Sequence, residues 1–330
     1  MGKRILITGA GGFIGGRLSH RLLADPSVEE IVTVDKKPVQ NWYTVLDSYV
    51  PNGKKIKNIM GDLTSSSFAS NVTEGIDEIY HMACDMGGMG FIESNKALCM
   101  LSVVPDSNTI RAAQKNGVKK FLFASTACVY SSLYQEHPGT EGLSESMIHP
   151  FDPEDGYGWE KLFMERMCRH FNEDFGMETR VVRYHNVYGP VGTWKGGREK
   201  APAALCRKVI EAIENKTGTI EIWGDGEQTR SFLFIEDALD GTLNVMNSDF
   251  IRPFNVGSDF GVSINQLVDI IEEIAKVKLK RIYVEGPLGV RGRNSENSDV
   301  RKLLNWEPKI SLKEGLTKTY EWIYDQYRSK

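Results

Sequence analysis

A glycine-rich turn near the start of the chain sets the strictest condition on the fold. The run Thr8-Gly9-Ala10-Gly11-Gly12-Phe13-Ile14-Gly15 joins an apolar stretch to an amphipathic one. Glycines at 9, 12 and 15 permit a tight turn, a close backbone approach to a pyrophosphate and close packing of helix on strand. The N-terminus of the helix then faces the phosphates with its partial positive charge. This pattern between a strand and a helix predicts a dinucleotide site.

The first half of the chain alternates short apolar runs with amphipathic stretches, which predicts a parallel sheet with helical crossovers. The expected strands cover residues 4–8, 31–35, 57–61, 78–82, 120–125 and 180–184. Helices are expected at 13–24, at 108–116, after Tyr157 as far as Gly176, and from the capping box 263–266 through Ala275. We therefore expect an α/β fold, a doubly wound parallel sheet with a smaller C-terminal substrate-binding lobe.

A change of composition near Asn186 predicts how the domains divide. Gly, Pro, Lys and Trp cluster from there through Lys200, which is typical of a substrate-facing loop. We expect residues 1–186 to form the nucleotide-binding domain, with 232–257 returning to it. Residues 187–231 and 258–330 would form the second lobe.

Bulk composition excludes several classes of function. The net charge of -4 predicts no binding to nucleic acid or to an anionic membrane. No apolar run approaches the roughly 20 residues of a membrane span, and no signal peptide precedes the first strand, so we expect a cytoplasmic protein. The five cysteines are an odd number without CxxC spacing, which predicts free thiols and no metal site.

Two acidic positions follow strands where an adenosine would lie. Asp35 ends the second predicted strand, and a carboxylate there accepts hydrogen bonds from a ribose and repels the 2′-phosphate of NADP. NAD is therefore the expected cofactor, although Lys36 and Lys37 weaken the preference. Asp62 and Leu63 after the third strand suit the adenine edge, and a helix-cap or turn role for Asp62 is an equal alternative.

Tyr157 and Lys161 lie four residues apart, which places both on one face of a helix. A free tyrosine has a pKa of about 10, and a neighbouring cation is expected to lower it and to make the phenol a usable base. Thr126, at the end of a strand, would orient the substrate oxygen. An ordinary surface helix is the alternative for such a pair.

These residues resemble the extended short-chain dehydrogenase/reductase family, over nearly the whole chain. The resemblance implies a Rossmann domain that binds NAD, a smaller lobe that holds a nucleotide sugar, and a homodimer formed through two helices per subunit. The segments 228–232 and 292–294 look like the family's diphosphate contacts, and Arg suits bidentate phosphate binding. Surface ion pairing is the alternative for Arg230 and Arg293.

A narrower similarity is to the GDP-sugar epimerases of this family, in the segments 85–91, 127–128, 157–161, 185–190, 192–202, 223–232 and 289–295. It implies transient oxidation at C4 of the hexose, which acidifies the hydrogens on C3 and C5, with GDP-mannose as the expected substrate. It assigns the proton transfers to Cys128 and Lys200. It also places around the substrate Gly87, Asn186, Glu199, Lys208, Gln228 and Arg293.

The residue types fit these roles, but alternatives remain. A nearby cation is expected to bring the thiol pKa of Cys128 from about 8.5 toward neutrality, and burial can lower that of Lys200. Taken alone, Cys128 is more often a buried small hydrophobe and Lys200 a solvated charge. Lys195 is an alternative proton donor.

The rival functions are a C4 dehydrogenase or 4,6-dehydratase of a GDP-hexose or GDP-heptose, and a non-catalytic NAD-binding regulatory protein. The segments 101–107 and 131–153 depart from the expected pattern, and Pro105 is expected to disturb a helix start.

Overall fold

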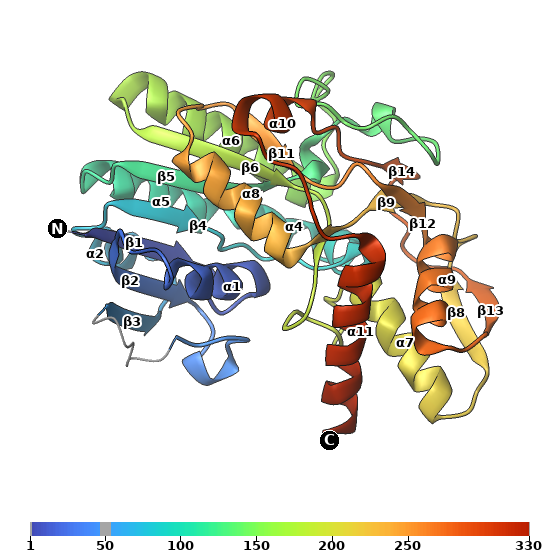
Figure 1. Ribbon diagram of the computed structural model, residues 1–330. Coiled ribbons are helices and arrows are strands. Elements are labelled where there is room, and N and C mark those ends of the chain that lie inside the picture. The colour runs from blue at the N-terminus through green and yellow to red at the C-terminus, as the bar shows by residue number, and fades with distance from the viewer. Residues whose placement is uncertain (1, 47–53, 330) are drawn as a thin grey trace.

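A seven-stranded parallel sheet forms the centre of the protein (Figure 1). The computed structural model describes residues 2–46 and 54–329. The strand order is β11-β6-β5-β4-β1-β2-β3, so the chain winds outward in both directions from the β1–β4 pair. Such a switch point leaves a crevice at the carboxyl ends of the strands. The strands are β1 (Lys3–Thr8), β2 (Val28–Asp35), β3 (Lys55–Met60), β4 (Glu78–His81), β5 (Lys120–Thr126), β6 (Glu178–Tyr184) and β11 (Pro253–Val256).

Helices cover both faces of this sheet (Figure 1). One face carries α1 and α8, which contact each other, and the other carries α2, α5 and α6. Alternate strand side chains enter the two cores: Ile5 and Ile7 face the first, and Leu6 faces the second. The doubly wound fold predicted from the sequence is confirmed. These helices are α1 (Phe13–Leu22), α2 (Ser66–Thr73), α5 (Val103–Lys115), α6 (Asp155–Phe175) and α8 (Ile235–Asn247).

A second group of elements lies beside the carboxyl ends of the strands (Figure 1). In it α7 contacts α9 and α11, and two small sheets pair β13 with β8 and β12 with β9 and β14. Its elements are α7 (Ala201–Glu214), β8 (Thr219–Trp223), β9 (Thr229–Ser231), β12 (Gly261–Ser263), α9 (Ile264–Ala275), β13 (Lys280–Val284), β14 (Gly292–Arg293) and α11 (Leu312–Arg328). Shorter connecting elements are η1 (Val39–Asn41), α3 (Met89–Ser94), α4 (Lys96–Met100), η2 (Ala127–Val129), η3 (Ser132–Tyr134), β7 (Val187–Tyr188), β10 (Leu233–Phe234) and α10 (Ser298–Leu304).

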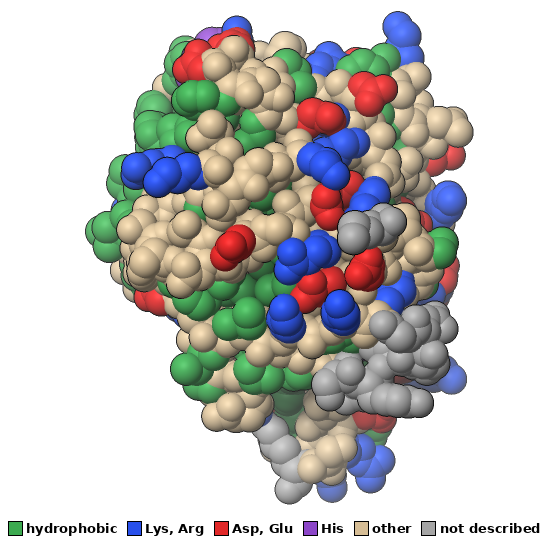
Figure 2. Space-filling view, turned by 90° about the vertical axis from the view of Figure 1, so that its left-hand side faces the viewer, with side chains coloured by type: hydrophobic (Ala, Val, Ile, Leu, Met, Phe, Trp, Pro, Cys, Tyr) green, Lys and Arg blue, Asp and Glu red, His purple; other side chains and the backbone are tan. Residues whose placement is uncertain are grey.

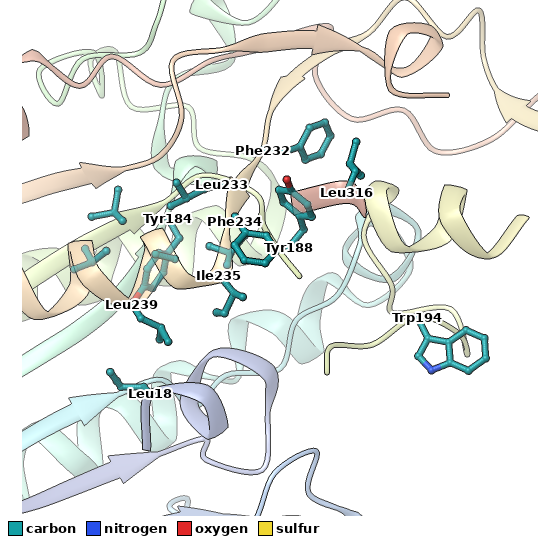
Figure 3. Close-up of a cluster of buried hydrophobic side chains, with 14 of the residues drawn as sticks. Leu18, Tyr184, Tyr188, Trp194, Phe232, Leu233, Phe234, Ile235, Leu239 and Leu316 are labelled. Atoms are coloured by element: carbon teal, nitrogen blue, oxygen red, sulfur yellow. The ribbon is translucent and has the colours of Figure 1, made fainter. Parts of the chain in front are cut away.

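A continuous apolar cluster joins the two groups of elements (Figure 3). Tyr188 packs edge-on against Phe234, with ring centroids 5.7 Å apart. Leu18 of α1, Leu239 of α8 and Leu316 of α11 belong to the same cluster, which therefore spans both parts of the molecule. This shared core holds the second group against the crevice end of the sheet.

The predicted elements are found, with shifts at their ends of up to five residues, the largest at the start of α5, which begins at Val103 and not at residue 108. The predicted strands differ from the observed ones by up to three residues at their starts, and the capping box of Ser263 and Gln266 opens a helix that ends at Ala275, as predicted. One expectation is wrong: Pro105 does not disturb the start of a helix. It lies in the first turn of α5, where backbone N–H groups have no intrahelical partner, so a proline costs the helix no hydrogen bond.

The surface carries charges of both signs. In the view of Figure 2, Lys and Arg side chains alternate with Asp and Glu, and hydrophobic side chains gather toward the left-hand edge. Among the residues that the structure describes, no helix combines the length and the apolar character needed to cross a membrane.

Candidate functional site

The glycine-rich turn adopts a conformation that side chains would obstruct. Gly9 has a φ of +67°, and its carbonyl accepts a hydrogen bond from the N–H of Gly12 at 3.0 Å. A Cβ at Gly15 would lie 2.5 Å from the Gly9 oxygen, so this glycine permits the close helix–strand contact that was predicted. Phe13 and Ile14 begin α1, whose N-terminus has no side-chain cap. Its backbone N–H groups are therefore available to an anion.

Asp35 lies beside this turn at the end of β2. Its carboxylate accepts hydrogen bonds from the backbone N–H of Gly11 at 3.0 Å and of Lys37 at 2.9 Å. The Lys37 ammonium reaches back to the Gly11 carbonyl at 2.9 Å. The predicted ribose acceptor and the predicted phosphate cradle are thus neighbours.

Asp62 and Leu63 follow β3 at the same edge of the sheet. The Asp62 carboxylate accepts a hydrogen bond from the Thr64 N–H at 2.9 Å, which is the turn role considered as the alternative. Leu63 is buried, and its carbonyl accepts from the Asn108 amide at 3.0 Å. Contact with an adenine stays a prediction for both residues.

The residues present fit a bound NAD. An uncapped helix start, a glycine turn without side chains and a carboxylate at the end of β2 lie together at the switch point of the sheet. These groups would hold the pyrophosphate and the ribose, respectively.

Tyr157 and Lys161 lie one turn apart on α6 and are both buried. The Lys161 ammonium lies 6.0 Å from the centroid of the Tyr157 ring and 4.5 Å from that of Phe123. Thr126 ends β5 and faces the same cavity as Tyr157. The expectation of a lowered phenol pKa is wrong for the protein alone: burial raises the pKa of Tyr157 well above its ordinary value, because the phenolate would lose its water.

Several buried polar side chains surround the Lys161 ammonium. Its Nζ lies 3.7 Å from Asp106 Oδ2 and 3.5 Å from Glu160 Oε2. The His81 ring lies behind, with Nε2 2.8 Å from Asp106 Oδ1 and Nδ1 2.8 Å from Thr8 Oγ1. Burial opposes the lysine charge, but Glu160 and the nearby acids outweigh it and hold the pKa of Lys161 above its ordinary value. The ammonium is therefore charged.

Cys128 lies in η2 directly after Thr126, within a network of buried polar groups. Its sulfur accepts a hydrogen bond from Arg293 Nη1 at 3.3 Å, and the Thr126 hydroxyl accepts from its backbone N–H at 3.3 Å. Arg293 also donates from Nη2 to Glu154 Oε2 at 2.9 Å and from Nε to Gln135 Oε1 at 2.6 Å. The predicted lowering of the thiol pKa is wrong. Burial, assisted by the Glu154 carboxylate, raises the pKa of Cys128 to about 11, although the Arg293 charge opposes this.

Lys200 immediately precedes α7 and faces the same cavity as Cys128. Burial lowers the pKa of its ammonium, in the direction predicted. The alternative donor, Lys195, is exposed and lies over the Trp194 ring, 5.0 Å from its centroid. It does not line the cavity, and this geometry favours Lys200.

One cavity, partly open to solvent, collects the predicted substrate residues. They come from segments far apart in the sequence and line its wall together: Gly87, Thr126, Cys128, Tyr157, Asn186, Glu199, Lys200, Lys208, Gln228, Arg230 and Arg293.

Two cationic side chains of the cavity wall are held in place by backbone carbonyls. Arg230 donates to the carbonyls of Leu288 at 3.0 Å and Val290 at 2.7 Å. Lys208 donates to the Glu221 carbonyl at 2.9 Å, and its ammonium lies 5.6 Å from the centroid of the Trp223 ring.

The remaining predicted residues are also anchored. The Gln228 amide donates to the Trp223 carbonyl at 3.2 Å, and the Asn186 amide donates to the Ser231 carbonyl at 3.0 Å. Glu199 pairs with Arg207 at 3.1 Å. Anchored polar groups on a partly apolar wall are typical of ligand sites.

Sequence reasoning did not single out Glu154, Asp106, Glu160 or His81. One signal was available: Asp106 is an ionisable residue inside the segment 101–107 that departed from the expected pattern. Glu160 stands next to Lys161, but adjacency alone does not predict that both are buried. Within the ranges 2–46 and 54–329, no group of His, Cys, Asp and Glu could hold a metal ion.

Known proteins share both the sequence and the fold. The sequence pattern of the NAD dependent epimerase/dehydratase family matches residues 5–257. GDP-mannose 3,5-epimerase of Arabidopsis thaliana is 44% identical over 324 residues, which cover 98% of this chain and 82% of that protein.

Solved structures of sugar epimerases superpose on nearly the whole chain. UDP-glucose 4-epimerase from Thermotoga maritima has a TM-score of 0.83 at 24% identity and covers 98% of this chain and 99% of its own. UDP-glucuronic acid 4-epimerase from Bacillus cereus, in complex with UDP-glucuronic acid and NAD, has a TM-score of 0.81 at 25% identity, covering 98% of this chain and 100% of its own. Since the family pattern spans most of the sequence, and a relative is 44% identical over 98% of it, the chain is an enzyme of the NAD-dependent epimerase/dehydratase family.

Proposed function

We propose that this enzyme epimerises a GDP-sugar, with GDP-mannose inverted at C3 and C5. The observation that carries the proposal is the meeting of Cys128 and Lys200 with Tyr157 in one cavity. A simple dehydrogenase needs only the tyrosine and lysine of α6, whereas inversion at carbons beside the 4-keto group needs two further proton-transfer groups. GDP-mannose 3,5-epimerases that are 44% identical support the choice of sugar.

The first chemical step concerns the C4 hydroxyl. Tyr157 would accept its proton, Thr126 would orient the oxygen, and the charged Lys161 would stabilise the phenolate. NAD, when bound, supplies the hydride acceptor at C4 and later the hydride donor. Burial keeps the Tyr157 phenol protonated in the protein alone, even with the charged Lys161 nearby. The phenolate base would therefore form only when bound NAD adds the positive charge of its nicotinamide and lowers the phenol pKa.

The second step inverts the carbon centres next to the 4-keto group. The ketone acidifies the hydrogens on C3 and C5. One of Cys128 and Lys200 removes a proton from a carbon, and the other returns a proton to the opposite face of that carbon. The proton count is unchanged over the step, since one group gains the proton that the other has lost.

The other cavity residues would bind the nucleotide sugar. Arg230 and Arg293 present buried guanidinium groups suited to the diphosphate. Lys208 and Gln228 extend the site beyond them. Gly87, Asn186 and Glu199 would lie around the hexose.

The rival functions have less support. Dehydrogenases and dehydratases of GDP-sugars use the same scaffold, but the GDP-sugar relatives at 44% identity are epimerases by name. A non-catalytic role leaves the buried and charged Lys161 beside Tyr157 without a purpose.

Isotope exchange tests the proposal. The purified enzyme, incubated with GDP-mannose in deuterated water, should incorporate deuterium at C3 and C5 without net formation of NADH. Absence of exchange, or NADH formed in proportion to substrate, would refute it.

Two matched variants separate a chemical role of the thiol from a structural one. Cys128→Ser should lose most exchange and still bind NAD. Cys206→Ala removes a buried thiol from the apolar core around α7 and should retain exchange. Equal exchange in both variants would remove Cys128 from the mechanism.

We also propose a homodimer formed through the region of α4 to α6. Large apolar side chains lie exposed there: Leu98, Met100, Leu101, Val104, Trp159 and Phe163. Monomeric proteins seldom expose apolar side chains so densely, and a helix-to-helix contact between two copies would cover them.

Location and domain division complete the proposal. The five unpaired cysteines are typical of a reducing compartment, which supports the cytoplasm. We retain a nucleotide-binding domain of residues 1–186 with 232–257, and a substrate lobe of 187–231 with 258–330. The mixed surface charge supports neither nucleic acid nor a membrane as partner.

A further inference from the structure

Glu154 lies directly beside Cys128, at the entrance of α6. Its backbone N–H donates to the Cys128 carbonyl at 2.8 Å, and its own carbonyl accepts from the Gly158 N–H at 2.8 Å. The carboxylate side chain is only 10% exposed. A buried carboxylate next to a candidate proton-transfer thiol is a group that the mechanism above does not use.

Arg293 connects the carboxylate to the thiol. Its Nη2 lies 2.9 Å from Glu154 Oε2, and its Nη1 lies 3.3 Å from the Cys128 sulfur. A guanidinium alone would stabilise a thiolate. Paired with a carboxylate, it forms a nearly neutral unit, and the attraction that a thiolate would feel from the arginine is offset by repulsion from the acid.

We propose that Glu154 is a positioning residue that acts with Arg293 to keep Cys128 in its thiol form in the resting site. This inference rests on the proposed epimerase function, in which Cys128 is a proton-transfer residue.

The other groups around the thiol agree with this assignment. Burial is the main cause that raises the pKa of Cys128 to about 11, and the Glu154 carboxylate adds to it against Arg293. Burial opposes ionisation of Glu154 as well, but Arg293 and the nearby Arg230 outweigh it and lower its pKa. Of the two neighbours Glu154 and Cys128, Glu154 is therefore the ionised one.

Two further elements face the thiol across the cavity. Burial lowers the pKa of Lys200, at the start of α7; Cys128 and Cys84 oppose this effect, and the Arg293 charge adds to it. Tyr157 on α6 has a pKa raised by burial, with Cys84 and Cys128 adding to the effect.

The pH at which Cys128 ionises tests the inference directly. Iodoacetamide labelling of the Cys128 peptide, followed by mass spectrometry from pH 6 to 10, reports thiolate formation without substrate. In the unmodified sequence the labelling rate should rise above the pKa of about 8.5 of a free thiol. Glu154→Gln keeps the shape of the side chain and removes its charge. It should move the midpoint down by about 1 to 3 pH units, because Arg293 is left unopposed.

Two control variants isolate the charge of Glu154. Glu154→Asp retains a carboxylate and should keep an alkaline midpoint. Glu145→Gln removes another buried carboxylate, which accepts from the Asn255 N–H, and should leave the midpoint unchanged. A midpoint in Glu154→Gln that stays in place or moves up would overturn the inference.

A second readout separates this inference from the function on which it rests. The pH profile of deuterium exchange into GDP-mannose should shift in the acid direction in Glu154→Gln, together with the labelling midpoint. If the unmodified enzyme shows no exchange while the labelling midpoint shifts, the proposed function fails and the charge coupling stands. If exchange occurs but neither profile shifts, the epimerase stands and Glu154 has no such role.

Discussion

Substitution of Gly9 by alanine tests the geometry of the nucleotide turn. Gly9 has a φ of +67°, and a left-handed conformation costs a residue with a side chain about 1–2 kcal/mol. The new Cβ would also lie 2.7 Å from the backbone nitrogen of Ala83 and 2.8 Å from its Cα. Backbone atoms cannot rotate away, and overpacking of this kind costs about 1–3 kcal/mol. The expected loss of unfolding free energy is therefore about 2–5 kcal/mol.

Gly117 provides a matched control, because it has the same left-handed conformation as Gly9 but open space around an added Cβ. Its φ is +70°, and a Cβ there would meet nothing within 4 Å. Gly117→Ala should therefore lose only the conformational part, about 1–2 kcal/mol. The gain from a less flexible unfolded chain is the same in both variants and cancels in the comparison.

Urea unfolding followed by circular dichroism measures both variants against the parent. Gly9→Ala should lie about 1–3 kcal/mol below Gly117→Ala and should also bind NAD more weakly, since the turn must move to relieve the contact with Ala83. If the unfolding free energies of the two variants agree within about 0.5 kcal/mol, Gly9 does not approach the backbone of Ala83 as closely as described, and the reasoning fails.

Three further outcomes are expected. Burial lowers the pKa of His81 and His185 to about 3, so between pH 6.5 and 3 the unfolded chain binds more protons than the folded one. Unfolding free energy should then fall on acidification by up to about 1.4 kcal/mol per pH unit for each histidine, and His81→Gln should make the slope measured by urea titration shallower. Asp35→Ala should weaken NAD binding about tenfold or more and NADP binding less, as measured by fluorescence titration, and equal losses would contradict its ribose role. Leu101→Glu should produce monomers in analytical ultracentrifugation, whereas Met60→Glu, with nearly equal exposure of 58% against 60%, should not; a dimer in both would exclude this interface.

The parallel sheet with helical crossovers could be predicted because short sequence patterns indicate each strand and the first crossover. Short apolar runs between turn residues mark strands that are buried on both faces, and the glycine triplet marks the first crossover. The ends of strands were less predictable: β2 begins at Val28 and not at residue 31. Pairing with a neighbouring strand decides such ends, and no short window of sequence contains that neighbour.

The grouping of the candidate residues was also largely predictable, since Tyr157, Cys128 and Lys200, for example, line one cavity. The choice between Lys195 and Lys200 was not. Only five residues separate them, and the fold places the half-buried Lys200 in the wall of the cavity that Cys128 lines and exposes Lys195 over Trp194. A spacing along the chain holds no information on which side chain faces a cavity.

Protonation states were predicted in the wrong direction for Cys128 and Tyr157. The sequence supplied the cations that lower a pKa, but burial outweighs them in both cases. Desolvation depends on every atom packed around a group, and Glu154 and Arg293, which meet beside Cys128, are 139 residues apart in the sequence. Residue types and local periodicity therefore determine the fold, the cofactor and the candidate chemistry of this protein. The charge that each group carries is determined by its three-dimensional surroundings, because electrostatic energy depends on distance and solvent access.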